Sequence, residues 1–361
     1  MSYNIVRVAA VDDGHFGNKS AVLDHNKEIQ NQISPTLVST ASAGFVQIAD
    51  TYEARYKTEQ KIGERVTDKE FTVLTEVAMG QQNSLVSTNN ANYQTSAAGR
   101  VMVNHMLKQM GCNDNHSILL MASSPVERFY KDGERNLEYI AKRRENFLKP
   151  VFTDGRKLPQ IIEVVEVPEA IAAFYNDYIQ YQRRENRLVV RLDESQLKKS
   201  CLYIDMGGRT IDTGVIDQGS VVVRDCKTFE NSGMLAIHEK LQTALKTYRD
   251  NISRKELDQI LRTSEFTPDL RAKSLNPINV GDHVERAVHE VIENAIGTIT
   301  SVYNFNDFNR VVFTGGSSAR LESHIKQYLP DAEVSPTALY DNVNGMLKFG
   351  ELKKKEFIKE M

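Results

Sequence analysis

Two short stretches combine an acidic residue with a glycine turn in the pattern that a phosphate-binding site requires. Each begins with an apolar run, and the two read VAAVDDG at residues 8–14 and YIDMGG at residues 203–208. Glycine lets backbone N–H groups approach phosphate oxygens closely, because it tolerates unusual dihedrals and has no side chain in the way. The pattern therefore predicts two phosphate-binding turns. The residues assigned to them are Asp13, Gly14, Gly207 and Gly208.

The acidic residues beside these turns predict a cation as well as a phosphate. A carboxylate about 4 Å from a phosphate is repelled by about 4 kcal/mol at an effective dielectric of 20, and Mg²⁺ reverses that sign. We therefore expect Asp12 and Asp205 to hold Mg²⁺, and Lys19 to reach the phosphates as a point charge. Taken singly, an Asp-Gly pair between short strands is more typical of a hairpin turn. Its recurrence at the start of both halves favours phosphate binding.

A third glycine-containing segment follows an apolar strand near the end of the chain. Residues 311–319 read VVFTGGSSA, a strand that enters Gly315 and Gly316 and then a helix that begins near Ser317. A nucleotide can lie against backbone at such a helix N-terminus. The segment is neither a Walker A loop nor G-x-G-x-x-G, so alone it indicates a structural turn as readily. Beside the other two turns, these three residues are predicted to bind the nucleotide.

Glu169 is the candidate catalytic residue. It follows the predicted strand 161–167 and Pro168, and proline suits the first position of a helix. Glutamate at a helix start is often only a partner of the helix dipole, worth about 0.3–1 kcal/mol. If this corner faces a nucleotide, the carboxylate can instead orient or deprotonate water, which typically contributes roughly 10²–10⁴-fold. Arg209 leaves a similar choice open, and a solvated loop charge is favoured there over a phosphate contact.

Composition predicts an ordinary globular protein of more than one domain. The chain has 361 residues with 45 basic and 48 acidic side chains, and single cores stop growing near about 250–300 residues. A net charge of −3 argues against broad electrostatic binding to nucleic acid. The three cysteines are scattered, the N-terminus lacks a signal pattern, and no apolar run approaches about 20 residues. We expect a soluble cytoplasmic protein that has no membrane partner.

Residue pattern along the chain predicts two lobes. The first lobe is expected over residues 1–199, with a smaller subdomain inserted at 39–95, and the second over 200–339. A C-terminal helix within 340–361 is expected to return to the first lobe. A helix is also predicted over 168–181, followed by a polar crossing between the lobes.

Five segments together resemble the superfamily of actin, chaperone ATPases and sugar kinases. That resemblance implies an α/β, actin-like (ribonuclease H-like) two-lobed ATPase fold with smaller inserted subdomains. Within the superfamily the chain is most similar to the ParM, or StbA, family of plasmid segregation actins. The five segments are VDDGHFGNKS, YIDMGGRTID, VVFTGGSSARL, VEVPEAIAAF and DNVNGMLKFG.

The resemblance implies an ATPase that forms head-to-tail helical filaments and segregates plasmid DNA. It assigns Asp12 and Asp205 to Mg-nucleotide, Lys19 to phosphate and Glu169 to hydrolysis, and it places Gly315 in the adenosine motif together with its neighbour. ATP is the expected nucleotide, with GTP as an alternative because the motif contacts the base largely through backbone. The implied partners are the chain itself, an adaptor protein of the ParR type and, only through that adaptor, plasmid DNA. A non-polymerising small-molecule kinase is the alternative function.

Overall fold

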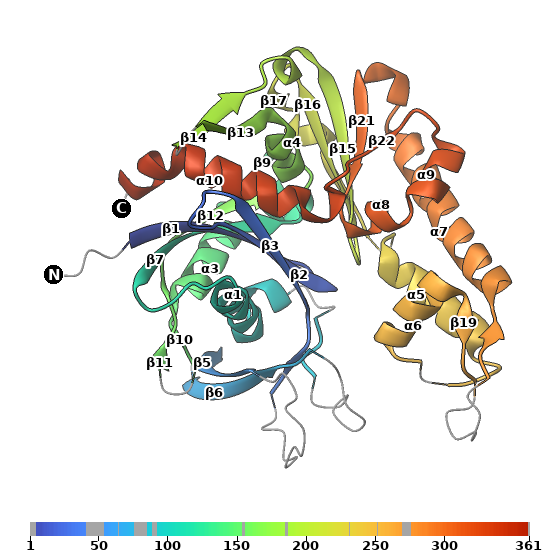
Figure 1. The fold of residues 1–361 in the computed structure, drawn as a ribbon, viewed down its shortest axis with the longest axis horizontal. Coiled ribbons are helices and arrows are strands. Elements are labelled where there is room, and N and C mark those ends of the chain that lie inside the picture. Colours follow the sequence, from blue (N-terminus) through green and yellow to red (C-terminus); the bar gives the residue numbers. More distant parts are fainter. Residues whose placement is uncertain are drawn as a thin grey trace.

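The described residues form two halves, each built on its own β-sheet, with a smaller sheet beside the first (Figure 1). None of the helices in the described residues is long and apolar enough to cross a membrane. This computed structural model describes residues 5–40, 54–63, 65–75, 85–88, 92–153, 156–184, 187–230, 232–250, 252–268 and 276–359.

A five-stranded sheet forms the centre of the first half, in the order β12-β7-β1-β2-β3. Its strands are β1 (Ile5–Asp13), β2 (Gly17–Leu23), β3 (Ile29–Pro35), β7 (His116–Ser124) and β12 (Gln160–Pro168). The helices on its two faces are α1 (Ala97–Gln109) and α3 (Leu137–Leu148) on one side and α10 (Asp341–Lys359) on the other. Because successive strand residues alternate between faces, Val11 packs with α1 and Ala10 packs with α10. With both faces covered, β1 is apolar and fully buried from Val8 to Val11, just before Asp12.

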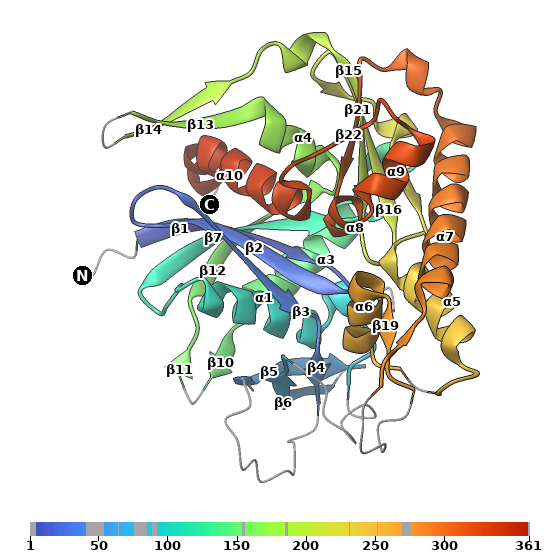
Figure 2. The ribbon, with the colours of Figure 1, turned by 45° about the vertical axis from the view of Figure 1, so that its right-hand side comes forward.

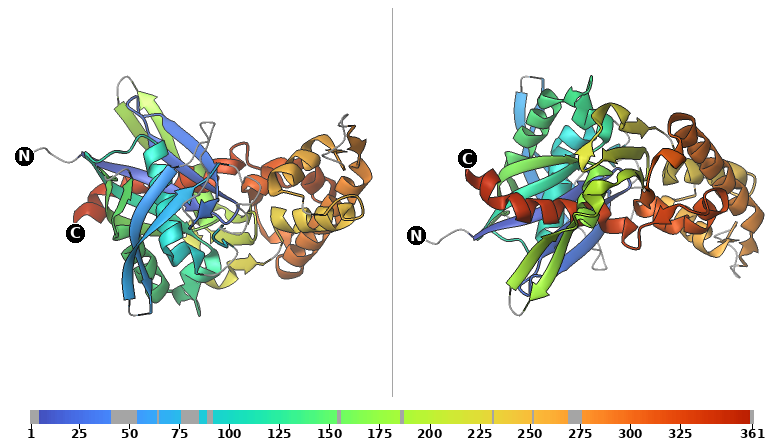
Figure 3. Two further views of the ribbon diagram at one scale, coloured as in Figure 1. Left: turned by 90° about the horizontal axis from the view of Figure 1, so that it is seen from below. Right: turned by 90° about the horizontal axis from the view of Figure 1, so that it is seen from above.

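The second half repeats this plan. Its sheet has the order β17-β16-β15-β21-β22, with β18 also paired to β16. Ile204 of the central strand packs toward the long helix α7, while Tyr203 faces α4. The strands are β15 (Ser200–Met206), β16 (Ile211–Asp217), β17 (Ser220–Val221), β18 (Lys227–Phe229), β21 (Arg310–Thr314) and β22 (Glu333–Val334). The helices are α4 (Ile171–Tyr178), α5 (Met234–Leu245), α6 (Arg254–Thr263), α7 (Gly281–Val302), α8 (Gly316–Arg320) and α9 (Glu322–Tyr328). Seen from above and below, α5, α6 and α7 gather at one end of the molecule (Figure 3).

Helices α4 and α10 cross between the two large sheets, α10 on the first and α4 on the second (Figure 2). At the crossing their backbones touch, since a Cβ built on Gly345 would lie 1.8 Å from the carbonyl oxygen of Ala172. Lys348 Nζ also donates to the carbonyl oxygen of Asn176 at 2.7 Å. This pair of helices therefore joins the two halves of the molecule.

A smaller sheet lies under α1, in the order β11-β10-β5-β6-β4. Tyr56 and Phe71 from this sheet pack on Val101 and Met102 of α1. Its strands are β4 (Val38–Ser39), β5 (Ala54–Ile62), β6 (Arg65–Val73), β10 (Val151–Thr153) and β11 (Arg156–Lys157). The sheet thus combines the predicted insertion at 39–95 with two later strands, and parts of that insertion lie outside the described residues.

The region after β12 differs from the sequence-based expectation. The helix predicted over 168–181 is shorter, because Pro168 still belongs to β12 and the chain re-enters a strand at Ile179. The predicted polar crossing contains a two-stranded hairpin, β13 (Ile179–Arg184) with β14 (Arg187–Leu192), instead of an irregular linker. The remaining short elements of the described residues are α2 (Val126–Phe129), β8 (Tyr130–Lys131), β9 (Glu134–Arg135), β19 (Glu265–Phe266) and β20 (Ile278–Asn279). The same residues contain 3₁₀ turns at 93–95, 196–198, 223–225, 305–307 and 338–340.

Candidate functional site

A cavity of about 140 Å³ lies where the hairpins β1–β2 and β15–β16 meet. Both halves of the chain line it, so residues far apart in sequence share one small space. It is smaller than the roughly 300–1,000 Å³ typical of ligand pockets. The predicted site residues in its lining are Asp12, Gly14, Lys19, Glu169, Asp205, Gly207, Gly208, Gly316 and Ser317.

In the first hairpin, an ion pair spans the two strands at the cavity. Asp12 lies directly opposite Lys19 in the register, and Lys19 Nζ is 2.9 Å from Asp12 Oδ2. Ser123 donates a hydrogen bond to the other carboxylate oxygen of Asp12 at 2.9 Å. Burial disfavours the ammonium of Lys19, but Asp12 and Asp205 raise its pKa above the usual value. The first hairpin therefore presents a cation to the cavity.

Asp13 faces away from the cavity, unlike its neighbour. Its two carboxylate oxygens accept hydrogen bonds from Arg143 at 3.0 Å each, and Arg143 Nε is 2.9 Å from Glu166. All three side chains are buried. Burial raises the pKa of Asp13 to about 7, against the lowering effect of Arg143. Asp13 thus anchors the strand end to α3 instead of lining the predicted phosphate site with its side chain.

The first turn reaches across to the second half through Phe16. A Cβ built on Gly208 would lie 2.5 Å from Cβ of Phe16, so only glycine fits at that point. The turn is held from below by Thr36, whose hydroxyl donates to the carbonyl oxygen of Gly14 at 2.7 Å. The two predicted phosphate turns are therefore in contact, and the absence of a side chain at Gly208 leaves room for Phe16.

In the second hairpin, Asp205 lies beneath the adenosine-type segment. Asn342 of α10 donates to Asp205 Oδ2 at 2.6 Å, and burial raises the pKa of Asp205 to about 6 although Lys19 lowers it. Gly315 has φ +88°, and a Cβ there would lie 2.1 Å from Asp205 Oδ1. Gly315 is absent from the cavity lining, and its glycine is required by this close approach. The next residues line the cavity, and Ser317 donates to the carbonyl oxygen of Gly207 at 2.7 Å.

Asp212 is a buried carboxyl group beside the site to which the sequence reasoning gave no role, and it does not line the cavity. It lies opposite Asp205 in the register and is buried. It accepts hydrogen bonds from the backbone N–H of Val126 at 2.8 Å and from the hydroxyls of Thr228 and Thr210 at 2.5 and 3.0 Å. Burial raises its pKa to about 7 despite these donors. The similarity of the two hairpins was the available signal for Asp212. Asp12 and Asp205 occupy matching positions, and each has a residue directly opposite on the second strand, Lys19 in the first hairpin and Asp212 in the second.

Glu169 stands at the corner between β12 and α4 and lines the cavity. Helix α4 begins only at Ile171, after Ala170 at φ +62°, so Glu169 precedes the helix instead of lying in its first turn. Burial raises its pKa well above the usual value, the carboxylates of Asp212, Asp12 and Asp205 raise it further, and Lys19 lowers it. A raised pKa makes the ionised form of Glu169 a stronger base, and only that form can accept a proton from water.

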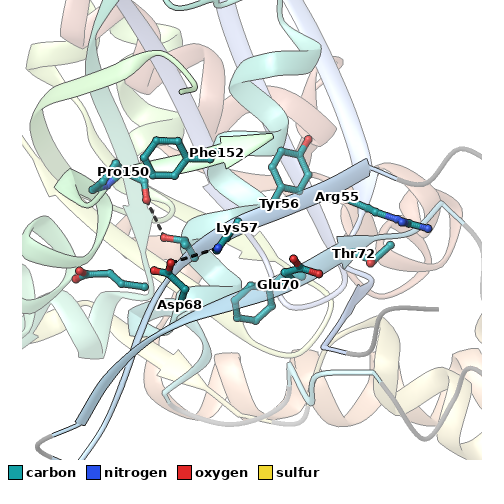
Figure 4. Close-up of a pocket in the computed structure, with 11 residues that line it drawn as sticks. Arg55, Tyr56, Lys57, Asp68, Glu70, Thr72, Pro150 and Phe152 are labelled. Atoms are coloured by element: carbon teal, nitrogen blue, oxygen red, sulfur yellow. Dashed lines mark hydrogen bonds and ion pairs between the residues drawn. The ribbon is translucent and has the colours of Figure 1, made fainter. Parts of the chain in front are cut away.

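Arg209 and a second cavity show no further catalytic arrangement among the described residues. Arg209 lines the cavity and pairs with Glu230 at 3.0 Å, so it is not simply solvated. A larger cavity, about 580 Å³, lies on the small sheet beside the Lys57–Asp68 ion pair (Figure 4). It contains none of the predicted site residues, and its size alone indicates no chemistry.

The described part of the chain contains no group of three or more His, Cys, Asp or Glu side chains arranged to hold a metal by themselves. Mg²⁺ is commonly held by one or two carboxylates together with phosphate oxygens and water, and such a site needs no protein cage. Asp12 and Asp205, which both line the cavity, fit that donor set.

Comparison with known proteins identifies the family. Residues 7–179 match the family described as plasmid segregation protein ParM, N-terminal, and residues 195–349 match plasmid segregation protein ParM, C-terminal. No curated protein sequence matches the chain.

Solved structures with the same fold cover nearly the whole chain. A 15-stranded ParM filament from Clostridium botulinum aligns with TM-score 0.71 and 19% identity, over 96% of this chain and 99% of that one. The archaeal actin homologue Ta0583 gives TM-score 0.70 and 13% identity over 96% and 99% of the two chains. Bacillus thuringiensis ParM with ATP gives TM-score 0.64 and 13% identity over 97% and 99%. These likenesses confirm the predicted actin-like fold.

Proposed function

The chain belongs to the ParM (StbA) family of plasmid segregation proteins, and from that premise we propose that it is an ATPase whose filaments move plasmid DNA in the cytoplasm. One observation carries the nucleotide part of this proposal. Two hairpins from opposite halves bring Asp12, Lys19 and Asp205 into one cavity with Glu169. Mg-ATP is the ligand whose charges match that set, since Lys19 is an anion partner and the carboxylates are metal ligands.

In this proposal each half of the chain has its own task. The glycine turns meet the phosphates through backbone N–H groups, and Asp12 and Asp205 hold bound Mg²⁺, which supplies charge neutralisation. Glu169 orients the attacking water and accepts its proton. Because both halves line the cavity, a bound nucleotide that is larger than the cavity would change the distance between them. Loss of the γ-phosphate on hydrolysis would change that distance again.

Filament growth follows from a head-to-tail contact between identical chains. Such a heterologous contact does not close on itself, and it therefore continues as a helix. The filament of the C. botulinum relative supports the same assembly for this chain. We assign the link to plasmid DNA to an adaptor protein of the ParR type, because a net charge of −3 does not favour direct binding to DNA.

Mg-ATP-induced assembly tests the proposal. We expect the purified chain to scatter light and to pellet after addition of Mg-ATP, with ATP turnover and without any small-molecule phosphate acceptor. Turnover that required an acceptor and produced no polymer would instead identify a kinase.

The Glu169→Ala variant tests the catalytic assignment. We expect its filaments to persist longer than those of the wild type, because hydrolysis slows by roughly 10²–10⁴-fold when a positioned acid–base group is removed. Glu145→Ala is the matched control, since Glu145 is exposed on α3 and makes only a 3.5 Å contact with Lys149. Equal disassembly rates for Glu169→Ala and the control would remove Glu169 from the mechanism.

A further inference from the structure

His238 on α5 is a buried ring with only one of its two nitrogens satisfied. Its Nε2 lies 3.1 Å from Asp258 Oδ1, and Arg320 NH1 lies 2.7 Å from the same oxygen. A carboxylate only accepts, so Nε2 carries a hydrogen, and Nδ1 is an acceptor in the form of the ring that carries no second proton. Nδ1 has no hydrogen-bond partner among the described residues, although the side chain is 3% exposed.

Asp258 keeps its charge in this arrangement. Burial raises its pKa, but the hydrogen bonds from His238 and Arg320 more than offset this, so that the pKa lies below the usual value. The ionised carboxylate therefore fixes the tautomer of His238. It also holds Arg320, the last residue of α8, against α6. The three side chains link α5, α6 and α8 in one chain of contacts.

This cluster lies at the wall of the candidate site. Arg320 and Phe16 both line the cavity, and the ring of Phe16 packs on the ring of His238 with centroids 5.7 Å apart. The same α8 begins immediately after Gly315, in the segment predicted to bind the nucleoside. Phe16 thus lines the cavity and packs on the ring of His238, which does not itself line the cavity.

The size of the cavity indicates what happens to Phe16. A cavity of about 140 Å³ is smaller than a typical ligand pocket, and opening the contact between Phe16 and the second half would supply room for a nucleoside triphosphate. Opening that contact uncovers the ring of His238. A buried acceptor without a donor costs free energy, and a ligand that supplies the donor recovers it.

We propose that His238 reads the nucleoside: its Nδ1 accepts a hydrogen bond from an N–H or O–H of the bound nucleotide, with Asp258 and Arg320 as positioning residues. The proposal rests on the proposed nucleotide binding and names a specificity determinant for it. The donor is either the 6-amino group of adenine or a ribose hydroxyl. A nucleotide that lacks the donor leaves Nδ1 unpaired in a dry site and binds more weakly.

Two amide substitutions separate the two nitrogens of His238. Gln places its amide at the distance of Nε2, so His238→Gln keeps the contact with Asp258 and removes the acceptor at Nδ1. Asn places its amide nearer the backbone, at the distance of Nδ1, so His238→Asn keeps the acceptor and loses Asp258. The thermal unfolding temperature of each variant without ligand reports whether its fold is intact.

Calorimetric titration of wild type and variants with four Mg-nucleotides tests the proposal. The ligands are ATP, the triphosphate of purine riboside, which lacks the 6-amino group, 2′-deoxy-ATP and 3′-deoxy-ATP. We expect wild type to bind one of the three analogues on the order of tenfold more weakly than ATP. His238→Gln should bind that analogue and ATP equally, and His238→Asn should keep the preference. The analogue concerned identifies the donor.

Three results would overturn the proposal. The first is wild type that binds all four nucleotides equally, and the second is a preference that His238→Gln retains. The third concerns wild type labelled with ¹⁵N-histidine, in which the Nδ1 signal of His238 should shift with ATP and not with inorganic tripolyphosphate. An unmoved signal contradicts the proposal whether or not the variants fold. Failure of wild type to bind either ATP or tripolyphosphate would instead reject the proposed nucleotide site as a whole.

Discussion

Asp12 lies opposite Lys19 in the first hairpin of the site, whereas Asp205 lies opposite Asp212 in the second. The backbone plan is the same, an apolar strand that ends in an acidic residue and turns back through glycine. The charges are not, because one cross-strand pair is neutral in sum and the other is doubly acidic. Hairpins with like charges directly opposite are less stable than those with complementary ones.

The supports behind the two hairpins differ in the same direction. Behind the first, Arg143 joins Asp13 to Glu166 in a fully buried ion network. Behind the second, Asp212 is held only by neutral donors from Thr228, Thr210 and the backbone of Val126. The acidic residues of the first hairpin are therefore paired with cationic side chains of the chain itself. In the second hairpin the acidic pair has no such partner across the strands, and a bound cation would reduce the repulsion between the two carboxylates.

Substitution of Arg143 should have the largest effect, because it removes the ion network that supports the first hairpin. Arg143→Met leaves Asp13 and Glu166 buried without a cation, which typically costs about 3–5 kcal/mol of the free energy of unfolding. Arg144→Met is the control, because Arg144 is the adjacent residue and its ion pair with Glu163 is 46% exposed on the arginine side. Exposed pairs contribute about 0–1 kcal/mol. Denaturant titration compares the two, and equal losses would contradict a structural role for the buried network.

Substitution of Lys19 should have the next largest effect, because it leaves the cross-strand pairs of both hairpins with net negative charge. Lys19→Met leaves Asp12 next to Asp205 without the cation between them, and it removes a charged hydrogen-bond donor worth about 1.5–3 kcal/mol. We expect the affinity for Mg-ATP to fall roughly 10–100-fold in an equilibrium titration. Lys57→Met, in the exposed ion pair with Asp68, should leave that affinity unchanged. An unaltered affinity in Lys19→Met would show that Lys19 does not reach the phosphates.

A smaller effect should appear in the pH dependence of stability, and it concerns Asp212 in the second hairpin. The pKa of Asp212 rises from 3.8 to about 7 on folding. Between these values the folded chain holds more protons than the unfolded chain, so this group lowers stability as pH rises from about 4 to 7. Asp212→Asn removes that contribution.

The decrease in the free energy of unfolding between pH 5 and pH 8 should therefore be shallower in Asp212→Asn, by on the order of 1–2 kcal/mol. Asp205 and Asp13 also have raised pKa values and stay in both proteins, so a residual slope is expected. Denaturant titrations at several pH values measure the difference. Parallel curves for variant and wild type would mean that Asp212 is ionised equally in the folded and unfolded chains.

Much of the site could be predicted because its signals are local. An apolar run followed by Asp and Gly is a strand end and a turn wherever it occurs, and the chain has two such runs that end in Asp12 and Asp205. The segment around Gly315 is equally local, although its reason, the close approach to Asp205, is visible only in the fold.

The side chain of Asp13 could not be placed from sequence. Its partner Arg143 lies 130 residues away on a helix whose neighbours Lys142, Arg144 and Glu145 are charged, which is the pattern of a solvated face. The predicted length of α4 was wrong for a different reason. Helical periodicity continues past Tyr178, but pairing of Ile179 with Leu192 in a hairpin ends the helix, and such pairing depends on residues further along the chain.

The crossing of α4 and α10 at Gly345 restricts which sequences this fold tolerates. Because the carbonyl oxygen of Ala172 occupies the place of a Cβ at position 345, even alanine would force the two helices apart by more than an ångström. Helix α10 packs on the first large sheet and α4 packs on the second, so neither helix can move away from the other without disturbing its packing on that sheet. A saturation library at codon 345 should consequently return a single amino acid, although Gly345 does not line the candidate site.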